Sequence, residues 1–206
     1  MSVDFKSIVG NGELKSRISR DISEKTLSHA YIIEGHRGIG CHTFAYNIAA
    51  ALACTSEDNI PCGECRNCKK ILSFTSPDVI TVGLEEDKAT ISVEAIRAIR
   101  DDMPIAPNDL ETKVYIIEDA DLMTVQAQNA LLLSLEEPPS YVLFFLLCEN
   151  SSSLLETIRS RAPSLRLQLL PMPLTGHRAA RAVRCQINRT CRWIGHISAC
   201  RSSFAA

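Results

Sequence analysis

Short apolar runs alternate along the chain with longer segments in which apolar and polar residues recur at helical spacing. The apolar runs predict buried strands at residues 30–34, 79–82, 114–117 and 142–147. Because these runs contain almost no polar positions, they are typical of a parallel sheet that is covered on both faces. The amphipathic segments predict helices at residues 11–27, 43–53, 92–103 and 124–137. Leucines alternate with polar residues over 165–169, as in a strand at a sheet edge, and the whole pattern predicts an α/β domain.

A glycine-rich segment lies between the first predicted strand and the helix that follows it. Residues 35–43 read Gly-His-Arg-Gly-Ile-Gly-Cys-His-Thr. A phosphate-binding loop has the pattern Gly-x-x-x-x-Gly-Lys-Ser/Thr, in which the glycines admit the phosphates, the lysine neutralises them and the hydroxyl holds magnesium. The candidate phosphate-binding residues are Gly35, Gly38, Gly40, Cys41, His42 and Thr43.

The glycines of this loop have the expected spacing, but the residues that supply its chemistry are different. Cys41 stands at the lysine position and His42 at the hydroxyl position, while Thr43 is one residue too late to hold magnesium. A lysine ammonium beside a phosphate contributes several kcal/mol at an effective dielectric constant of ~20. The sequence therefore predicts that ATP binding is weak or absent and that the chain does not hydrolyse ATP. Weak binding through backbone N–H groups at the helix N-terminus remains open.

Four cysteines lie close together in a segment that interrupts the α/β pattern. Cys54, Cys62, Cys65 and Cys68 have the spacing C-x7-C-x2-C-x2-C. Two successive C-x2-C steps are typical of a tetrahedral zinc site, and four protein ligands leave no open position for a catalytic water. We expect a structural Zn²⁺ in an insert at residues 54–68. The alternative is four independent buried or redox cysteines. Cys41 and Cys148 have no nearby cysteine in the sequence, and we expect both to be small buried apolar residues.

Length and charge suggest one domain followed by a different kind of segment. The chain has 206 residues, and no apolar run reaches the ~18–20 residues that a membrane span requires. The N-terminus lacks the features of a signal peptide, so we expect a cytoplasmic protein without a membrane partner. All acidic residues lie at or before Glu156, whereas residues 173–206 hold six arginines, three cysteines and no acid. We therefore expect a domain at 1–170 and an Arg/Cys/Ser-rich tail at 171–206.

Two explanations of this tail remain open. A basic segment can contact DNA phosphates. A shifted reading frame or a truncated gene also explains scattered Arg, Cys and Ser residues with a single Trp193 and no acid.

The order of the motifs resembles one family closely. The glycine loop and the cysteine insert are followed by Lys-Val-Tyr-Ile-Ile-Glu-Asp-Ala-Asp (113–121), Asn-Ala-Leu-Leu-Leu-Ser-Leu-Glu-Glu-Pro-Pro (129–139) and Thr-Ile-Arg-Ser-Arg (157–161). This order resembles the AAA+ subunits of the bacterial DNA polymerase III clamp loader over about residues 5–170. The resemblance implies a three-layer AAA+ domain of the P-loop type with a parallel five-stranded sheet and a zinc insert. It also implies that the helical lid and collar domains of the family are missing from residues 171–206.

Within this family, the degenerate glycine loop resembles the delta-prime branch. The resemblance implies a non-hydrolysing stator of the DNA polymerase III holoenzyme, which binds the delta and gamma/tau subunits and helps the complex load the sliding clamp onto primed DNA. The alternative is a gamma/tau-like motor subunit that hydrolyses ATP with an atypical loop. A third alternative, suggested by the tail alone, is a non-functional fragment.

The resemblance also assigns roles to single residues. The Ser160-Arg161 pair matches the Ser-Arg-Cys motif of the family, with Ala162 in place of cysteine. It implies that Arg161 acts as an arginine finger in the ATP site of the neighbouring subunit, with Arg159 as the alternative.

Three further positions of the family pattern remain open. Glu118 and Asp119 either cap a strand end or are vestiges of a metal site. The γ-phosphate sensor falls within Cys148–Asn150, with no choice among the three residues. Leu133 replaces a lysine that is common in the family, and we expect it to be buried, with a partner-facing surface as the alternative.

Overall fold

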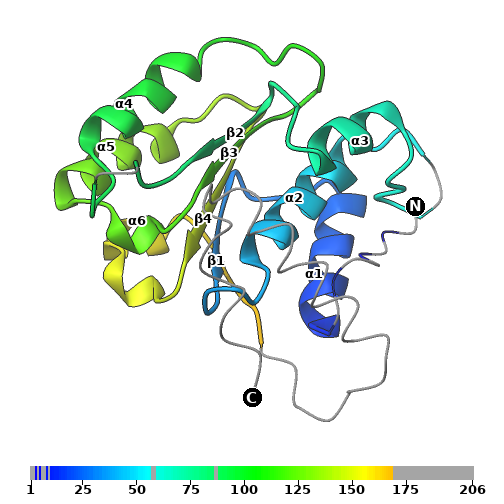
Figure 1. Ribbon diagram of the computed structural model, residues 1–206, viewed down its shortest axis with the longest axis horizontal. Helices are drawn as coiled ribbons and strands as arrows, with labels where there is room; N and C mark the ends of the chain where they lie inside the picture. Colours follow the sequence, from blue (N-terminus) through cyan, green and yellow to red (C-terminus); the bar gives the residue numbers. More distant parts are fainter. Residues whose placement is uncertain are drawn as a thin grey trace, which may run out of the picture. The chain divides into compact units, whose positions relative to one another are not determined.

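A computed structural model describes residues 3, 5, 8, 10–56, 59–85 and 88–168. In this part of the chain, five parallel strands form one sheet in the order β2-β3-β4-β1-β5 (Figure 1). The strands are β1 (Ala30–Glu34), β2 (Val79–Val82), β3 (Lys113–Ile117), β4 (Val142–Cys148) and β5 (Ser164–Arg166). The predicted parallel sheet of five strands is confirmed.

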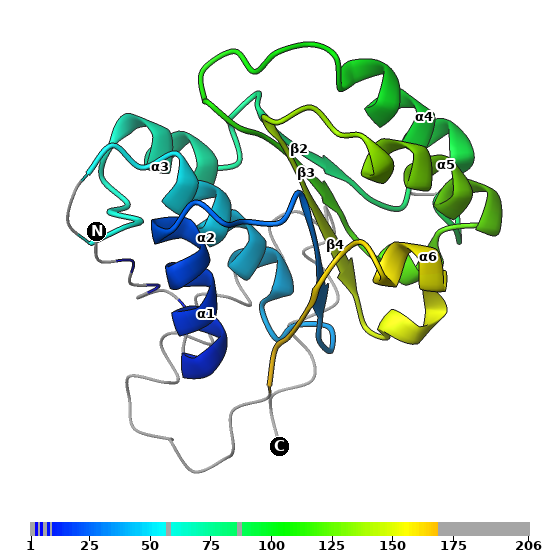
Figure 2. The same cartoon turned by 180° about the vertical axis from the view of Figure 1, so that it is seen from behind.

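Helices cover both faces of the sheet, as Figures 1 and 2 show from opposite sides. One face carries α1 (Gly12–Ser23), α2 (Cys41–Leu52) and α3 (Arg66–Leu72). The other face carries α4 (Val93–Asp102), α5 (Val125–Glu136) and α6 (Glu156–Arg159), together with the short 3-10 turns η1 (Ala120–Leu122) and η2 (Ser151–Ser153). The fold is therefore the expected three-layer α/β arrangement of AAA+ proteins. None of the helices described is long and apolar enough to cross a membrane.

The central strands are apolar at almost every position because both of their faces are buried. In β1, Tyr31 and Ile33 belong to the hydrophobic cluster under α1–α3, whereas Ala30 and Ile32 belong to the cluster under α4–α6. Successive side chains of a strand point to opposite faces. Each face therefore requires its own apolar set, and the alternating pattern of a half-exposed strand disappears.

Helix boundaries follow local capping chemistry. The Thr124 side chain accepts a hydrogen bond from the Ala127 N–H (3.1 Å) and so begins α5, which ends ahead of Pro138 and Pro139. The first predicted helix was expected to reach residue 27, but α1 ends at Ser23. Lys25 has a φ of 55° in the left-handed region, which stops the helix there.

One prediction about burial is wrong. The side chain of Leu133 on α5 is 60% exposed rather than buried. Leu131 and Leu135 pack into the core from the same helix. Neighbouring residues of a helix lie about 100° apart, so a run of adjacent leucines cannot turn wholly toward one face. The alternative, a surface that faces a partner, stays a prediction.

The last strand is the expected edge strand. Among the described strands, β5 pairs with β1 alone, and Leu165 and Leu167 are buried while Arg166 and Gln168 are exposed. Leu169 and the tail at 171–206 lie outside the described residues, and so do the predictions made for them.

The strand order determines where a site can form. β1 and β4 are neighbours, and the chain leaves their carboxyl ends toward opposite faces of the sheet, into α2 and α6 (Figures 1 and 2). In parallel α/β sheets such a switch point leaves a crevice in which ligands bind. The glycine loop follows β1 at this edge of the sheet.

Candidate functional site

The glycine loop has a backbone that requires glycine. Gly38 has a φ of 83°, and Gly40, which precedes the first turn of α2, has a φ of 107°. L-residues with a side chain rarely adopt these angles. A Cβ on Gly35 would lie only 2.8 Å from Ile39 Cγ2 and 2.9 Å from Cys41 Sγ. The strand, loop and helix of a phosphate-binding motif are thus in place.

The residue at the lysine position of the loop carries no charge. Cys41 packs against the hydrophobic cluster under α1–α3 and is partly buried. Burial raises the pKa of its thiol to about 11, so the group is neutral at neutral pH. Cys148, at the end of β4, is buried, and burial raises its pKa to about 12. Cys148 is the small buried residue that we expected, whereas Cys41 is only partly so.

The residue at the hydroxyl position contacts the end of β3. His42 Nε2 lies 3.0 Å from Glu118 Oε1, which makes an ion pair when the imidazole is protonated. The ring centroid of His42 lies 4.6 Å from that of Tyr46 and 5.4 Å from that of Phe74. In a nucleotide-binding loop the hydroxyl and a strand-end carboxylate share a magnesium ion. Here the corresponding side chains contact one another directly.

Arg37 connects the loop to the ends of β3 and β4. Its Nη2 lies 3.1 Å from Asp119 Oδ1, and its Nε lies 3.7 Å from Glu149 Oε1. The Arg37 backbone N–H also donates to Glu149 Oε1 (3.0 Å). Of the three residues at the sensor position, Glu149 therefore contacts the loop, whereas the Asn150 side chain accepts from Ser152 N–H and caps η2.

Acidic side chains gather at this edge of the sheet. Glu34 accepts hydrogen bonds from Arg166 Nε (3.1 Å) and Ser151 Oγ (2.7 Å), and Asp121 accepts one from the Glu149 N–H (3.4 Å). Among the described residues, five carboxylates lie at this edge, those of Glu34, Glu118, Asp119, Asp121 and Glu149. Two guanidinium groups are paired with them, those of Arg37 and Arg166. A triphosphate would therefore meet an excess of negative charge.

Phe74 links the cysteine insert to the loop. It follows α3, its φ is 60°, and its ring lies 4.6 Å from that of Tyr46 at an interplanar angle of 76°. The Tyr46 hydroxyl in turn lies 2.8 Å from Thr81 Oγ1 on β2. Phenylalanine rarely adopts a positive φ, and the strain shows that surrounding contacts determine this backbone. The sequence gives no signal for this contact, since Phe74 is remote from the glycine loop.

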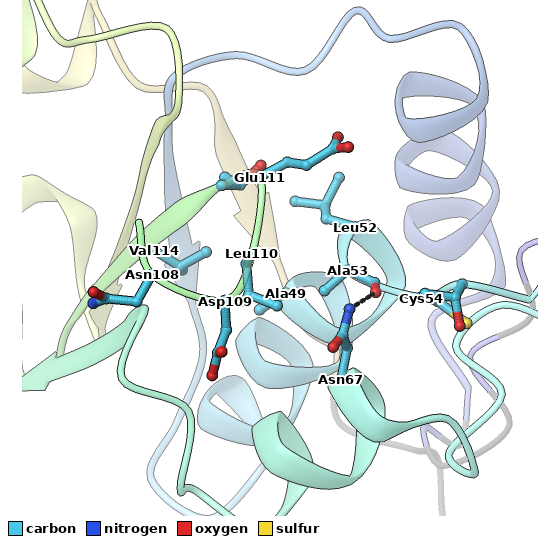
Figure 3. A pocket seen from close by; sticks show the side chains of 12 residues that line it. Ala49, Leu52, Ala53, Cys54, Asn67, Asn108, Asp109, Leu110, Glu111 and Val114 are labelled. Carbon is cyan, nitrogen blue, oxygen red and sulfur yellow. Dashed lines mark hydrogen bonds between the residues drawn. The ribbon is translucent and has the colours of Figure 1, made fainter. Parts of the chain in front are cut away.

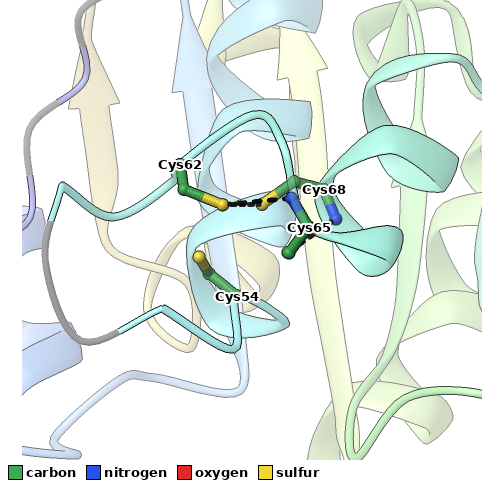
Figure 4. A group of neighbouring side chains, drawn as sticks. All are labelled: Cys54, Cys62, Cys65 and Cys68. Carbon is green, nitrogen blue, oxygen red and sulfur yellow. Dashed lines mark hydrogen bonds between the residues drawn. The ribbon is translucent and has the colours of Figure 1, made fainter.

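The four cysteines converge as their spacing predicts (Figure 4). The sulfur atoms of Cys54, Cys62, Cys65 and Cys68 all lie within 4.8 Å of one another. At ~2.3 Å from a tetrahedral zinc ion, sulfurs are about 3.8 Å apart. Cys62 Sγ and Cys68 Sγ are 4.0 Å apart. The cluster could therefore hold a metal ion.

Backbone N–H groups favour the thiolate form of two of these cysteines. Cys62 Sγ accepts from the Cys65 N–H (3.3 Å), and Cys65 Sγ accepts from the Cys68 N–H (3.4 Å). Hydrogen bonds from the backbones of Cys65 and Glu64 lower the pKa of Cys62. Burial opposes ionisation of Cys65, but hydrogen bonds from the backbones of Thr55 and Cys68 outweigh it and lower its pKa to about 6. Thiolates are the form that binds a metal.

A cavity of about 390 Å³ lies beside the cysteine cluster (Figure 3). It is bordered by the end of α2, by α3 and by the loop that precedes β3, with Cys54 and Asp109 among its lining. Asn67 Nδ2 donates to the Ala53 carbonyl (2.9 Å) and so joins α3 to the end of α2. This cavity lies at the opposite end of α2 from the glycine loop, so it is not the nucleotide crevice.

Arg161 lies just after α6 and is engaged within the chain. Its Nη1 donates to the Thr157 carbonyl and its Nη2 to Glu136 Oε1, both at 3.1 Å. Its side chain is 37% exposed. The alternative residue, Arg159, is exposed and has no ion pair in the part of the chain that the structure describes. The functional role of Arg161 stays a prediction. Sequence reasoning missed Arg37, whose only signal is a charged residue at a variable position of the loop.

Comparisons with known proteins agree with this fold. Residues 10–171 match the family described as "DNA polymerase III, delta subunit". The delta' subunit of DNA polymerase III from Bacillus subtilis (strain 168) is 35% identical over 174 residues, which are 82% of this chain and 51% of that protein. The tau subunit from the same organism is 35% identical over 158 residues, which are 76% of this chain and 28% of that protein.

A solved structure supports the fold alone. A DNA polymerase III gamma subunit-related protein from Thermotoga maritima superposes with a TM-score of 0.53 at 24% identity, covering 77% of this chain and 46% of that one. The chain thus spans about half the length, or less, of the proteins it matches. From the match over residues 10–171 and from these relatives, the chain belongs to the DNA polymerase III clamp-loader family, which includes delta', gamma and tau subunits.

Proposed function

We propose that this chain is a non-hydrolysing stator of a DNA polymerase III clamp loader, similar to delta'. The observation that supports this most strongly is the internal pairing of the loop, in which His42 contacts Glu118 and Arg37 contacts Asp119 and Glu149. A nucleotide would have to break these contacts and would find no lysine at Cys41. The subunit then works through its neighbours and not through ATP turnover of its own.

The proposed partners are the delta and gamma/tau subunits, and through them the sliding clamp and primed DNA. The test is to purify this chain together with recombinant delta and gamma/tau subunits from the same source. A complex that stays together through size exclusion and loads the clamp onto primed DNA is expected. A chain that elutes alone in every mixture contradicts the assignment.

We propose that the cysteine cluster holds a single structural Zn²⁺. The four thiolates of Cys54, Cys62, Cys65 and Cys68 would be its ligands, and the ion would cross-link the insert at residues 54–68 to α2 and α3. Metal analysis of the purified protein is expected to find one zinc per chain. A metal-free protein in which all four thiols react freely would contradict this proposal.

We propose that Arg161 is an arginine finger for the ATP site of a neighbouring motor subunit. An arginine supplied in trans stabilises the charge on the transferring phosphoryl group and can contribute ~10³–10⁵ in rate. In a reconstituted loader, Arg161→Ala is expected to abolish most of the DNA-stimulated ATPase activity. Arg159→Ala is measured beside it, because Arg159 is the exposed arginine two positions away that stands as the alternative finger. A loss of rate in Arg159→Ala alone would assign the role to Arg159. An unchanged rate in Arg161→Ala refutes the role.

The second candidate function is an ATP-hydrolysing motor similar to gamma/tau. The observation that favours it is the tau relative from Bacillus subtilis, which is as similar in sequence as the delta' relative, at 35% identity. The two functions differ in ATP turnover by the isolated chain. Magnesium-dependent hydrolysis that is lost when Gly40 or Cys41 is altered would favour the motor.

A further inference from the structure

The side chain of Arg161 contacts the C-terminal ends of two helices, α5 and α6. Glu136 is the last residue of α5, and Arg161 lies two residues beyond the end of α6. A carboxylate is unfavourable at the C-terminal end of a helix because the carbonyl groups there carry partial negative charge, and a cation is favourable there. Arg161 is favourable at both helix ends, since its positive charge neutralises Glu136 and its guanidinium group donates to a carbonyl group of α6.

The contacts of Arg161 restrain its guanidinium group but occupy only some of its N–H donors. Arg161 Nη1 donates to the Thr157 carbonyl and Nη2 donates to Glu136 Oε1, each at 3.1 Å. A guanidinium group has five N–H donors, so the contacts within the described part of the chain leave three for a further partner. The side chain of Arg161 is 37% exposed and that of Glu136 is 48% exposed, so the pair is accessible to a neighbouring subunit.

The backbone beside Arg161 is anchored to α5 as well. Buried Gln128 on α5 accepts from the Leu155 N–H through Oε1 (2.8 Å) and donates to the Ser153 carbonyl through Nε2 (3.3 Å). Ile158 and Ala162, on either side of Arg161, are buried in the core cluster under α4–α6. The Cα of Arg161 is therefore fixed by packing, and the freedom that remains is in its long side chain.

We propose that Glu136 is a positioning residue for Arg161. It restrains the guanidinium group so that less rotamer freedom is lost when Arg161 meets the phosphoryl group of the neighbouring ATP. This inference rests on the proposed function of Arg161 as a finger in trans. An arginine that is already restrained reaches its working geometry at a lower entropic cost.

The experiment compares variants of this chain in the reconstituted loader, with kcat and KM of the DNA-stimulated ATPase as readouts. Glu136→Ala is expected to lower kcat about 3- to 10-fold, the effect of freeing one long side chain, and to leave KM for ATP unchanged. Glu136→Gln keeps an acceptor oxygen for the same N–H and is expected to restore most of the rate. Glu137→Ala is the matched control, because Glu137 is the next residue and makes no hydrogen bond or ion pair with Arg161 among the described residues.

A second measurement follows Arg161 in the chain without its partners. Nitrogen NMR of the guanidinium groups, with the Arg161 signal identified by its loss in Arg161→Lys, reports rotation about the Nε–Cζ bond. Rotation is expected to be faster in Glu136→Ala than in wild type, and unchanged in Glu136→Gln and Glu137→Ala. Thermal unfolding of the four proteins checks that they are folded, since an exposed ion pair contributes little to stability.

The outcomes separate this inference from the proposed function. If Arg161→Ala leaves the ATPase unchanged, the finger is wrong and this inference falls with it. If Arg161→Ala abolishes activity while Glu136→Ala matches Glu137→Ala, the finger stands and the positioning role is overturned. A higher ATPase rate in Glu136→Ala would mean that Glu136 keeps Arg161 away from the ATP site. That result would also overturn the positioning role.

Discussion

The cysteine cluster and the glycine loop lie at the two ends of α2. The potential ligand atoms of the cluster face one another, whereas those of the loop are paired with other side chains of the protein. At the cluster, four sulfur atoms face one another, and backbone N–H groups lower the pKa values of Cys62 and Cys65. At the loop, the side chains at ligand positions are already paired within the chain, as His42 is with Glu118. Convergent donors without an internal counter-charge indicate a site for an external ion. Donors that are paired with each other support the proposal that the loop is kept for its shape.

The two regions are also connected through packing. α2 has 12 residues and is about 18 Å long, and α3 with the turn after it brings Phe74 back from the cluster to the loop. The ring of Phe74 lies against His42 and Tyr46. The turn after α3 therefore packs against the start of α2, next to the glycine loop.

The largest expected effect comes from disturbing the cluster. Cys68→Ser replaces a buried ligand, and chelation removes the metal that we propose. Structural zinc sites contribute about 10–16 kcal/mol of apparent binding free energy in small peptides, so either change is expected to lower the melting temperature sharply. Calorimetry with parallel metal analysis measures it. Cys148→Ala, a buried cysteine outside the cluster, serves as the control and is expected to keep its zinc.

The thiols of the two regions should differ in reactivity when the protein is free of metal. Cys65, with a pKa of about 6, is mostly thiolate at pH 7, whereas Cys41, with a pKa of about 11, is mostly thiol. Alkylation of Cys65 is expected to rise with pH through about 6 and then level off, while that of Cys41 should keep rising up to about pH 11. Timed iodoacetamide labelling with mass spectrometry follows both. Equal rates at pH 7 would contradict the contrast.

Phe74 tests the packing that connects the regions. Phe74→Ala removes the ring contacts and keeps the unfavourable φ, and is expected to lower the free energy of unfolding by about 2–3 kcal/mol at this half-buried site. Phe74→Gly loses the same ring but adopts positive φ freely, which recovers about 1 kcal/mol. Urea unfolding should therefore rank glycine above alanine. The reverse order would mean that the backbone at Phe74 is unstrained.

The smallest expected effect is at Leu133. Because its side chain is 60% exposed, Leu133→Ser is expected to change the free energy of unfolding by less than about 0.5 kcal/mol. Leu131→Ser, at a fully buried position two residues earlier, is the control and should cost several times more. Chemical unfolding of both variants compares them. A large loss of unfolding free energy in Leu133→Ser would mean that this side chain is buried, as the sequence predicted.

Features that depend on local pattern could be predicted from the sequence. The strands follow from apolar runs buried on both faces, and the cysteine cluster follows from ligand spacing within 15 residues. The glycines of the loop follow from their own spacing, as the positive φ values of Gly38 and Gly40 show.

Features that depend on distant parts of the chain could not be predicted. The pairing of Arg37 with Asp119 and Glu149 requires the ends of three strands to meet. The register of those strands depends on segments that are far apart in the sequence, so no single segment determines it. The exposure of Leu133 depends on which face of α5 meets the sheet, and three adjacent leucines leave that choice open.

The central claim of the proposed function is that the glycine loop binds a triphosphate weakly or not at all. Calorimetric titration of the isolated chain with ATP and magnesium tests it most directly, alongside a Cys41→Lys/His42→Thr double variant that restores the lysine and the hydroxyl and removes the partner of Glu118. We predict no saturable binding by the wild type, and affinity in the double variant raised by about tenfold or more. Micromolar, magnesium-dependent binding by the wild type, with hydrolysis that the isolated chain sustains, would contradict the account.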